Sequence, residues 1–432
     1  MSIIKYITFV AALLLALVLA LIGVLSVTRD TPVKSVLAEG DRDGPPSVSD
    51  SLFPRSIELY TGTHLDAANK IDVLLNGNGT YPRLWKDLAS AQHTITVQMY
   101  YSQPGAVADS LAKYLSMKAR AHVRVLLLLD AFGSQPLKPE WLQGLKKAGV
   151  EVVWLRPLRW YTLNKAAQRS HVRAVVVDGR IGYTGGFGLA DYWLGDGHHE
   201  DQWRESNVRF EGPTVAELQA AFAAGWAEAT GELLTGDLFF PHAGFAEKGD
   251  MEAGLMHSVP STGSTPAERL LALSIAGAHR TLYITNSYFV PGENFLQLLL
   301  KAAKRGVDVR VLTVSDKTDV KTTWYAGRTY YDKLLSGGVK VYEYQPTMMH
   351  AKTMVVDGVW SEIGSMNFDN RSLAFNNESL LLVLDKRFGA QMDSIFMDDI
   401  KYSKEIKLET FRKRPLPGRV LEWGAQKLRR VL

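Results

Sequence analysis

Two stretches of the 432-residue sequence pair a histidine with a cation two residues later. The first reads "HVRAVVVDGRIGYTGGFG" from His171, and the second reads "HAKTMVVDGVWSEIGSMN" from His350. A histidine can attack phosphorus or protonate a leaving alkoxide, and a nearby cation neutralises the non-bridging phosphate oxygens. Together the two stretches predict a single phosphodiester-cleaving site.

The cations are Arg173 in the first stretch and Lys352 in the second. Residues two apart on a strand point to the same side, so each cation should share a face with its histidine. An aspartate stands seven residues after each histidine, and we assign both to the catalytic set: Asp178 and Asp357.

A glycine-rich turn follows each of these strands. In the second copy it holds Gly364, Ser365 and Asn367, and in the first it holds Gly186. Ser365 and Asn367 supply neutral donors for phosphate oxygens, and the glycines let the backbone approach closely. We predict these four residues as phosphate-binding.

Each copy also has a carboxylate further along, Glu205 in the first and Glu378 in the second. A carboxylate bonded to the far imidazole nitrogen fixes the tautomer and raises the basicity of a histidine. Surface ion pairing is the alternative for both. No Asp/His cluster has metal-ligand spacing, so we expect a site without metal or cofactor, in which the basic pair stabilises the phosphate charge.

The elements that position these residues come from an internal repeat. "AQHTITVQMYYSQPG" (Ala91 to Gly105) aligns at an offset of 187 with "AHRTLYITNSYFVPG", and "HVRVLLLLD" aligns at 186 with "DVRVLTVSD". Continuous apolar runs such as Val123 to Leu129 are typical of strands covered by helices on both faces. We predict an α/β fold of two tandem repeats, 56–245 and 246–400, each a mixed, mostly buried β-sheet flanked by helices.

The N-terminal residues 1–27 predict a membrane anchor. The apolar stretch from Ile7 to Val27 has 21 residues, and at about 1.5 Å per residue it reaches about 31 Å, enough to cross a bilayer core. A cleaved signal peptide is the alternative, but its apolar region is normally shorter. Residues 28–55 are rich in Pro, Gly, Ser and Asp and predict a flexible tether. Cations on both sides of the stretch leave its orientation open.

The last segment, 401–432, holds ten Lys or Arg against three Glu. Val420, Leu421, Leu428 and Val431 follow a roughly helical spacing. We interpret it as a basic amphipathic tail. A helix on anionic lipid and a solvated helix packed on the domain both fit this pattern.

Composition sets broad limits. The chain is 46% hydrophobic and 22% charged, which is typical of a globular protein, and its net charge of +4 says little about partners. The absence of cysteine excludes disulfides, thiolate metal sites and a cysteine nucleophile.

The motifs resemble those of the phospholipase D superfamily, and within it the bacterial cardiolipin synthase branch. The family pattern H-x-K-x4-D-x6-G-S-x-N is complete in the second copy, and "FDNRSLAFNNE" after it resembles the branch's N-x-D-x-R-S-x-x-x-N-x-E run. The first copy's "DGRIGYTGGFGLADYWLG" is similar to the branch's "DGxxGFTGGxNIGDxYLG". Two positions depart from the family: Arg173 stands for the expected Lys and Gly188 for the expected Asn.

The resemblance implies that the sheets of the two repeats pack together with both histidines at the interface. It also implies a metal-independent reaction through a phosphatidyl-histidine, with His171 as nucleophile and His350 as general acid. The acceptor would be the glycerol hydroxyl of a second phosphatidylglycerol, giving cardiolipin and glycerol. The expected partners are this phospholipid and a membrane, the bacterial inner membrane, with no nucleic acid and no assignable oligomeric state.

Three other functions stay open at this point. A phospholipase D hydrolase would use water instead of an alcohol and release phosphatidic acid. A superfamily nuclease would need a basic groove interleaved with aromatic residues, for which "RPLRWYTLNKAAQR" before His171 gives some support. A non-catalytic lipid-binding protein is allowed by the altered first motif.

Overall fold

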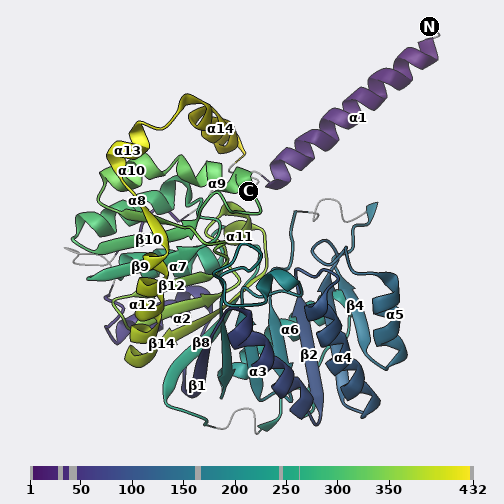
Figure 1. Cartoon of the computed structure of the whole chain (residues 1–432). Coiled ribbons are helices and arrows are strands. Elements are labelled where there is room, and N and C mark those ends of the chain that lie inside the picture. The colour runs from purple at the N-terminus through teal and green to yellow at the C-terminus, as the bar shows by residue number, and fades with distance from the viewer. Residues whose placement is uncertain are drawn as a thin grey trace.

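In the computed structural model, the strands of the described chain form one mixed sheet of fifteen (Figure 1). The structure describes residues 3–27, 33–37, 46–160, 167–242, 247–261 and 263–428, with the side chains of the first helix described between Lys5 and Leu21.

The sheet consists of two similar halves. The first half has the order β1-β7-β6-β5-β2-β3-β4 and the second has the order β8-β14-β13-β12-β9-β10-β11. The strands of the first half are β1 (Asp66–Leu75), β2 (Thr94–Met99), β3 (Arg124–Asp130), β4 (Glu151–Leu155), β5 (Ala174–Val177), β6 (Ile181–Gly185) and β7 (Ser206–Glu211). Those of the second half are β8 (Met251–Ser258), β9 (Thr281–Asn286), β10 (Asp308–Val314), β11 (Lys340–Tyr344), β12 (Lys352–Val356), β13 (Trp360–Gly364) and β14 (Glu378–Leu384). Because β1 and β8 pair antiparallel, the two halves are joined edge to edge.

Each half mixes parallel and antiparallel strands. The pairs β2·β3 and β3·β4 are parallel, as are β9·β10 and β10·β11. Helices lie against both halves (Figure 1). The first repeat has α3 (Asn76–Ser90), α4 (Ala106–Arg120), α5 (Pro139–Lys147), the short 3-10 helix η2 (Asp191–Trp193) and α6 (Thr214–Thr230). The second has α7 (Pro266–Ala276), α8 (Gly292–Lys304), α9 (Lys321–Arg328), α10 (Tyr331–Ser336), α11 (Asn370–Ala374) and α12 (Lys386–Lys401).

The two repeats share a hydrophobic core. Val208 and Phe210 of β7 belong to the same buried cluster as Ile363 of β13 and Leu381 of β14. A polar contact also crosses this core, since the hydroxyls of Thr184 and Ser379 lie 3.2 Å apart. The predicted α/β fold of two packed repeats is therefore confirmed.

The predicted tether is shorter than we expected. Residues 28–32 and 38–45 lie outside the described residues, but Val48 is fully buried and its N–H donates to the carbonyl of Gly277 at 3.1 Å. Helix α2 (Leu52–Thr61) packs on α7, with the ring of Phe53 edge-on to Trp360 at 5.1 Å. Apolar side chains thus draw this segment onto the second repeat, which corrects both the tether 28–55 and the start of the first repeat at 56.

The predicted tail 401–432 is also partly a component of the fold. Strand β15 (Ser403–Ile406) pairs antiparallel with β11 and buries Ile406, and α13 (Leu408–Arg412) follows it. Helix α14 (Leu416–Lys427) packs against α9. We did not predict β15, which extends the edge of the sheet, because the basic composition of this segment is not typical of a strand. Val431 lies outside the described residues.

Helix α1 (Ile3–Val27) extends away from the two repeats (Figure 1). Apolar side chains dominate its described part, and most of them are exposed. As far as the structure describes them, none of the helices is both long and apolar enough to span a bilayer. The transmembrane anchor stays a prediction, and the side chains of its last six residues lie outside the described set.

Candidate active site

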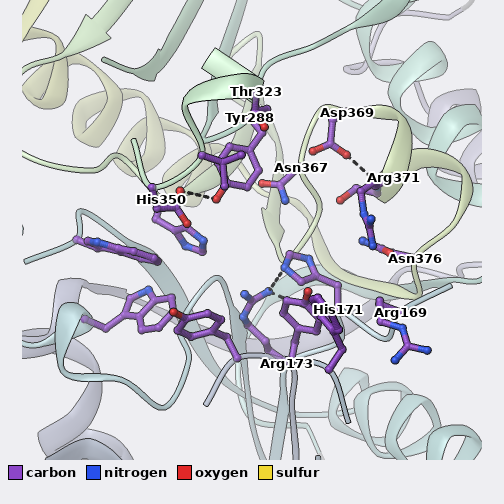
Figure 2. A pocket seen from close by; sticks show the side chains of 18 residues that line it. Arg169, His171, Arg173, Tyr288, Thr323, His350, Asn367, Asp369, Arg371 and Asn376 are labelled. Carbon is purple, nitrogen blue, oxygen red and sulfur yellow. Dashed lines mark hydrogen bonds between the residues drawn. The ribbon is translucent and has the colours of Figure 1, made fainter. Parts of the chain in front are cut away.

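Both histidines line one pocket between the repeats (Figure 2). Its cavity volume is about 460 Å³. The lining residues include aromatic groups, cations and amides from both repeats: Tyr100, Tyr101, Phe132, Arg169, His171, Arg173, Trp193, Trp203, Tyr288, Asp319, Val320, Thr323, His350, Asn367, Asp369, Arg371, Ser372 and Asn376.

The backbone beside each histidine is held by the other repeat. The N–H of His171 donates to the carbonyl of Asn377 at 2.8 Å, and the N–H of His350 donates to the carbonyl of Arg204 at 2.8 Å. Asn377 and Arg204 each precede a glutamate in sequence. The backbone pairing therefore brings each of those glutamates next to the histidine of the opposite repeat.

The glutamates complete a crossed arrangement. Nδ1 of His171 lies 3.0 Å from a carboxylate oxygen of Glu378, and Nδ1 of His350 lies 2.6 Å from Glu205. Both carboxyl groups are fully buried. The sequence predicted a carboxylate behind each imidazole, and the structure adds that each pair spans the two repeats.

The cations lie beside their own histidines, as the two-residue spacing predicts. Nη1 of Arg173 is 3.1 Å from Nε2 of His171, and Nζ of Lys352 is 3.1 Å from both ring nitrogens of His350. Lys352 also donates to the hydroxyl of Ser287 at 2.9 Å. All four side chains are almost completely buried, so their charges act through a medium that screens little.

Burial controls the protonation of this site. It lowers the pKa of His171 to about 4, with a further decrease from Arg173 and an opposing effect from Glu378. The pKa of His350 is also well below its ordinary value, because of burial and the charges of Lys352 and Arg173. Both imidazoles are therefore neutral at pH 7. Burial likewise lowers the pKa of Lys352 to about 7, although Glu205 opposes this shift.

The two glutamates differ. Burial raises the pKa of Glu205, and the charge of Lys352 only partly offsets that effect. Burial would also raise the pKa of Glu378, but the charge and hydrogen bond of His171, with a bond from the Ser365 hydroxyl, hold it below its ordinary value. Glu378 is thus the ionised partner of His171, whereas Glu205 retains a proton more readily beside His350.

The two aspartates that we assigned to the catalytic set lie elsewhere. The Asp178 carboxylate accepts backbone N–H bonds from residues 92, 93 and 94 at 2.7–2.9 Å, just before and at the start of β2. Asp357 accepts equivalent bonds from residues 279, 280 and 281 at the start of β9. Both follow the far end of the strand that begins near the histidine, so the catalytic assignment is corrected to a structural one.

Three of the four predicted phosphate-binding residues are engaged in other contacts within the fold. The hydroxyl of Ser365 donates to Glu378 at 2.5 Å, and the N–H of Gly186 donates to Oδ1 of Asn207 at 3.0 Å. A Cβ on Gly364 would lie 2.2 Å from the carbonyl oxygen of Ser379, so this glycine permits close strand packing. Only Asn367 of the four lines the pocket, and its buried Oδ1 accepts no hydrogen bond within the described chain.

Gly188, which stands for the family's Asn, has no room for a side chain. A Cβ there would lie 2.8 Å from the ring of Trp193 and 2.9 Å from the carbonyl oxygen of Tyr101. The indole N–H of Trp193 donates to Glu205 at 3.1 Å. The space next to Gly188 is therefore filled by the tryptophan that holds Glu205.

Sequence reasoning missed the aromatic wall of the pocket. The ring of Trp203 stacks on His350 at 4.9 Å, that of Trp193 meets the same imidazole edge-on at 5.3 Å, and Tyr100 packs edge-on to His171 at 4.9 Å. It also missed Arg169 and Arg371 in the lining, although Arg371 belongs to the quoted "FDNRSLAFNNE" run.

The segment that suggested a nuclease is described only in part. Its residues Tyr161–Ala166 lie outside the described residues, and its Arg156 is ion-paired with Glu228 at 2.7 Å. Over the described chain, no three His, Asp or Glu side chains are grouped as a metal site would require.

Two α/β repeats whose histidines line one pocket, each histidine with a cation beside it and a glutamate from the other repeat behind it, define the phospholipase D-like class of enzymes. The chain belongs to the family described as "Cardiolipin synthase, PLD-like domain", whose model matches residues 84–226 and 271–400.

Curated relatives carry the same description. A cardiolipin synthase of Geobacillus kaustophilus is 34% identical over 366 residues, which cover 84% of this chain and 72% of the relative. One of Halalkalibacterium halodurans is 32% identical over 351 residues, covering 81% and 70%. Among solved structures, phosphatidylserine synthase from Haemophilus influenzae matches with a TM-score of 0.66 at 13% identity, covering 88% of this chain and 100% of that one. At that identity the likeness shows the fold alone.

Proposed function

We propose that this chain is a phosphatidyltransferase that joins two phosphatidylglycerol molecules into cardiolipin and releases glycerol. The observation that carries the proposal is the crossed arrangement of His171 with Glu378 and His350 with Glu205 around one pocket. Membership of the cardiolipin synthase family supports the choice of substrate.

In the first step, Nε2 of His171 attacks the phosphorus of one phosphatidylglycerol. The bond between phosphorus and the glycerol oxygen breaks, and the leaving oxygen takes the Nε2 proton of His350, while Glu205 passes its own proton to Nδ1 so that the imidazole stays neutral. The ionised Glu378 holds Nδ1–H of His171 and so directs the lone pair of Nε2 towards the substrate. The raised pKa of Glu205, 2.6 Å from His350, favours retention on this carboxyl of the proton that replaces the one His350 donates.

In the second step, the roles reverse. His350 takes the proton from a hydroxyl of the second phosphatidylglycerol at Nε2 and returns its Nδ1 proton to Glu205. The deprotonated oxygen attacks the phosphorus, and the phosphorus–nitrogen bond breaks to regenerate neutral His171. Arg173 and Asn367, which line the pocket, bind the non-bridging oxygens throughout, and Lys352 beside His350 adds its positive charge. A bound phosphodiester is an anion next to Lys352, so it would raise the pKa of this lysine again and favour its charged form.

The proposal also places the enzyme at the bacterial inner membrane, with α1 as its anchor. The described apolar side chains of α1 are mostly exposed, so the repeats leave them largely uncovered. A phospholipid substrate resides in the bilayer, and an enzyme anchored in the same bilayer meets that substrate at high local concentration.

The test is product analysis with the purified full chain and vesicles of phosphatidylglycerol labelled in the headgroup glycerol. Cardiolipin and labelled glycerol should form in equal amounts. His171→Ala and His350→Ala should each lower turnover by about a thousandfold or more, because the two act as one unit. A parallel reaction with phosphatidylglycerol labelled in its phosphorus, quenched in alkali, should leave labelled phosphate on His171 of the wild type and none on His171→Ala. Phosphatidic acid as the sole product would replace the transferase with a hydrolase, and near-normal turnover of either variant would refute the shared site.

A further inference from the structure

Arg371 is a pocket cation without a role in the steps above. It lies in α11, lines the pocket and is half-buried. Among the described residues its guanidinium forms no ion pair, and its hydrogen bond to the carbonyl of Ala167 is long, at 3.5 Å. It contacts neither histidine, in contrast to Arg173 and Lys352.

Three arginines converge on the His171 side of the pocket (Figure 2). The charges of Arg371, Arg173 and Arg169 all lower the pKa of Tyr100, against the burial and the charge of Asp130 that raise it. Arg173 lies 3.1 Å from Nε2 of His171 and serves the reacting phosphate in the proposed mechanism. Arg169 lies 3.8 Å from Asp130 and donates to the carbonyl of Arg156 at 3.1 Å. Of the three, Arg371 therefore has the guanidinium most available to an incoming anion.

Asn376 adds a second feature on the same side of the pocket. Its Nδ2 donates to Glu378 at 3.4 Å, which fixes the amide orientation because the opposite one would set two acceptor oxygens together. Its Oδ1 is buried and accepts no hydrogen bond from the residues that the structure describes. A buried acceptor without a donor is unfavourable, and a hydroxyl group would satisfy it. A phosphodiester has no proton to give at neutral pH, so the matching ligand is a polyol.

We propose that Arg371 and Asn376 form the acceptor subsite, in which Arg371 binds a phosphate and Asn376 binds a hydroxyl of one phosphorylated polyol. The inference rests on the proposed transferase and extends it. The reacting phosphate must lie between the two histidines, where Arg173 and Lys352 already bind it, so a cation outside that set serves a second anion. A phosphatidylglycerol acceptor carries such an anion one glycerol unit away from its attacking hydroxyl.

Two soluble acceptors that differ by one phosphate group test this subsite. The full chain is given phosphatidylglycerol vesicles as donor, with labelled glycerol or labelled glycerol 3-phosphate as acceptor, and kcat/KM is measured for each. Wild-type enzyme should prefer the phosphorylated acceptor. Arg371→Gln should reduce that preference by about ten- to a hundredfold, as expected for loss of one charged hydrogen-bond donor. Arg371→Lys should retain part of it.

Arg387→Gln is the matched control, because Arg387 is exposed on α12 and pairs with Asp250 at 2.6 Å. It should keep the wild-type preference. With phosphatidylglycerol as acceptor, Arg371→Gln should raise the acceptor KM more than it lowers kcat. An unaltered preference in Arg371→Gln, or equal use of both acceptors by the wild type, would refute the subsite alone. A wild type that hydrolyses the donor and transfers to no acceptor would instead refute the transferase itself.

Discussion

At the scale of single residues, burial sets the working protonation states. His171 and His350 are both neutral near pH 7, so either imidazole can act as a nucleophile without first losing a proton. What distinguishes the two is the carboxyl group behind each ring, ionised at Glu378 and more readily protonated at Glu205. Paired groups with separated pKa values are how a site divides acid and base roles. The difference between the two carboxyl groups therefore assigns attack to His171 and proton donation to the pair of His350 and Glu205.

The pH dependence should report Lys352. Its pKa in the free enzyme is about 7, so it loses its charge as the pH rises through that value, and the binding of an anionic phosphate weakens. We expect kcat/KM to fall on the alkaline side with an apparent pKa near 7. Lys352→Arg keeps its charge and should move that limb to higher pH. The measurement is a pH profile of kcat/KM for both proteins.

Lys333→Arg provides the control for this profile, since Lys333 is exposed on α10 and paired with Glu293 at 3.1 Å. Its profile should match the wild type. An alkaline limb that stays in place in Lys352→Arg would assign the titration to another group.

The sequence predicted correctly which side chains of one strand share a face, but it did not predict which residues of different strands contact each other. The histidine and cation of each motif converge because the two-residue period of a strand is local. The crossed glutamates join residues 207 and 145 positions apart, and no local rule predicts which carboxylate reaches which ring. Asp178 and Asp357 were misassigned for a related reason. Both aspartates occupy the same motif position because they accept backbone N–H bonds in the same way. The motif position alone does not show whether a residue serves folding or catalysis.

At the scale of elements, strands and tight contacts hold the crossed pairs in place. Gly186 follows β6, and a Cβ there would lie 2.4 Å from the Glu205 carboxylate. The glycine is thus required by the approach of a buried side chain.

The repeat itself was predictable from the offsets near 187. The packing of α2 on the second repeat was not, because its apolar residues lie in a segment whose Pro, Gly, Ser and Asp content is typical of a flexible tether.

Gly186→Ala should therefore displace Glu205 and deprive His350 of its partner. We expect turnover to fall by about a hundredfold, the usual order for loss of an orienting carboxylate, and the free energy of unfolding to fall by about 1–3 kcal/mol from overpacking. Gly144→Ala on α5 is the control, because nothing lies within 4 Å of its added Cβ. It should be neutral or stabilising. Thermal unfolding and turnover are measured together, and full activity in Gly186→Ala would contradict the tight fit.

At the scale of the whole molecule, α14 links the outer surface to the pocket. One side of α14 packs on α9, where the buried Glu422 pairs with Arg328 at 3.2 Å and with Arg414 at 2.6 Å. Helix α9 in turn contributes Thr323 to the pocket lining. On the predicted apolar face of this helix, Val420, Leu421 and Leu428 are exposed, and so is Trp423 at 63%. Helix α14 lies on the side of the body from which α1 projects (Figure 1).

This arrangement favours contact of α14 with anionic lipid, because each exposed apolar side chain would bury area in the bilayer. The double variant Val420→Ser with Trp423→Ala should therefore bind phosphatidylglycerol vesicles more weakly than the wild type, by about tenfold or more. Salt should weaken the wild type as well, since Arg419 and Lys427 of α14 add charge attraction. The measurement is vesicle co-sedimentation, with Met117→Ser on α4 as control because Met117 is 42% exposed on the first repeat. Turnover of a short-chain soluble substrate should stay unchanged in the double variant, because its residues do not line the pocket. Equal vesicle binding by the double variant and the control would leave α14 as a packing helix and assign membrane attachment to α1 alone.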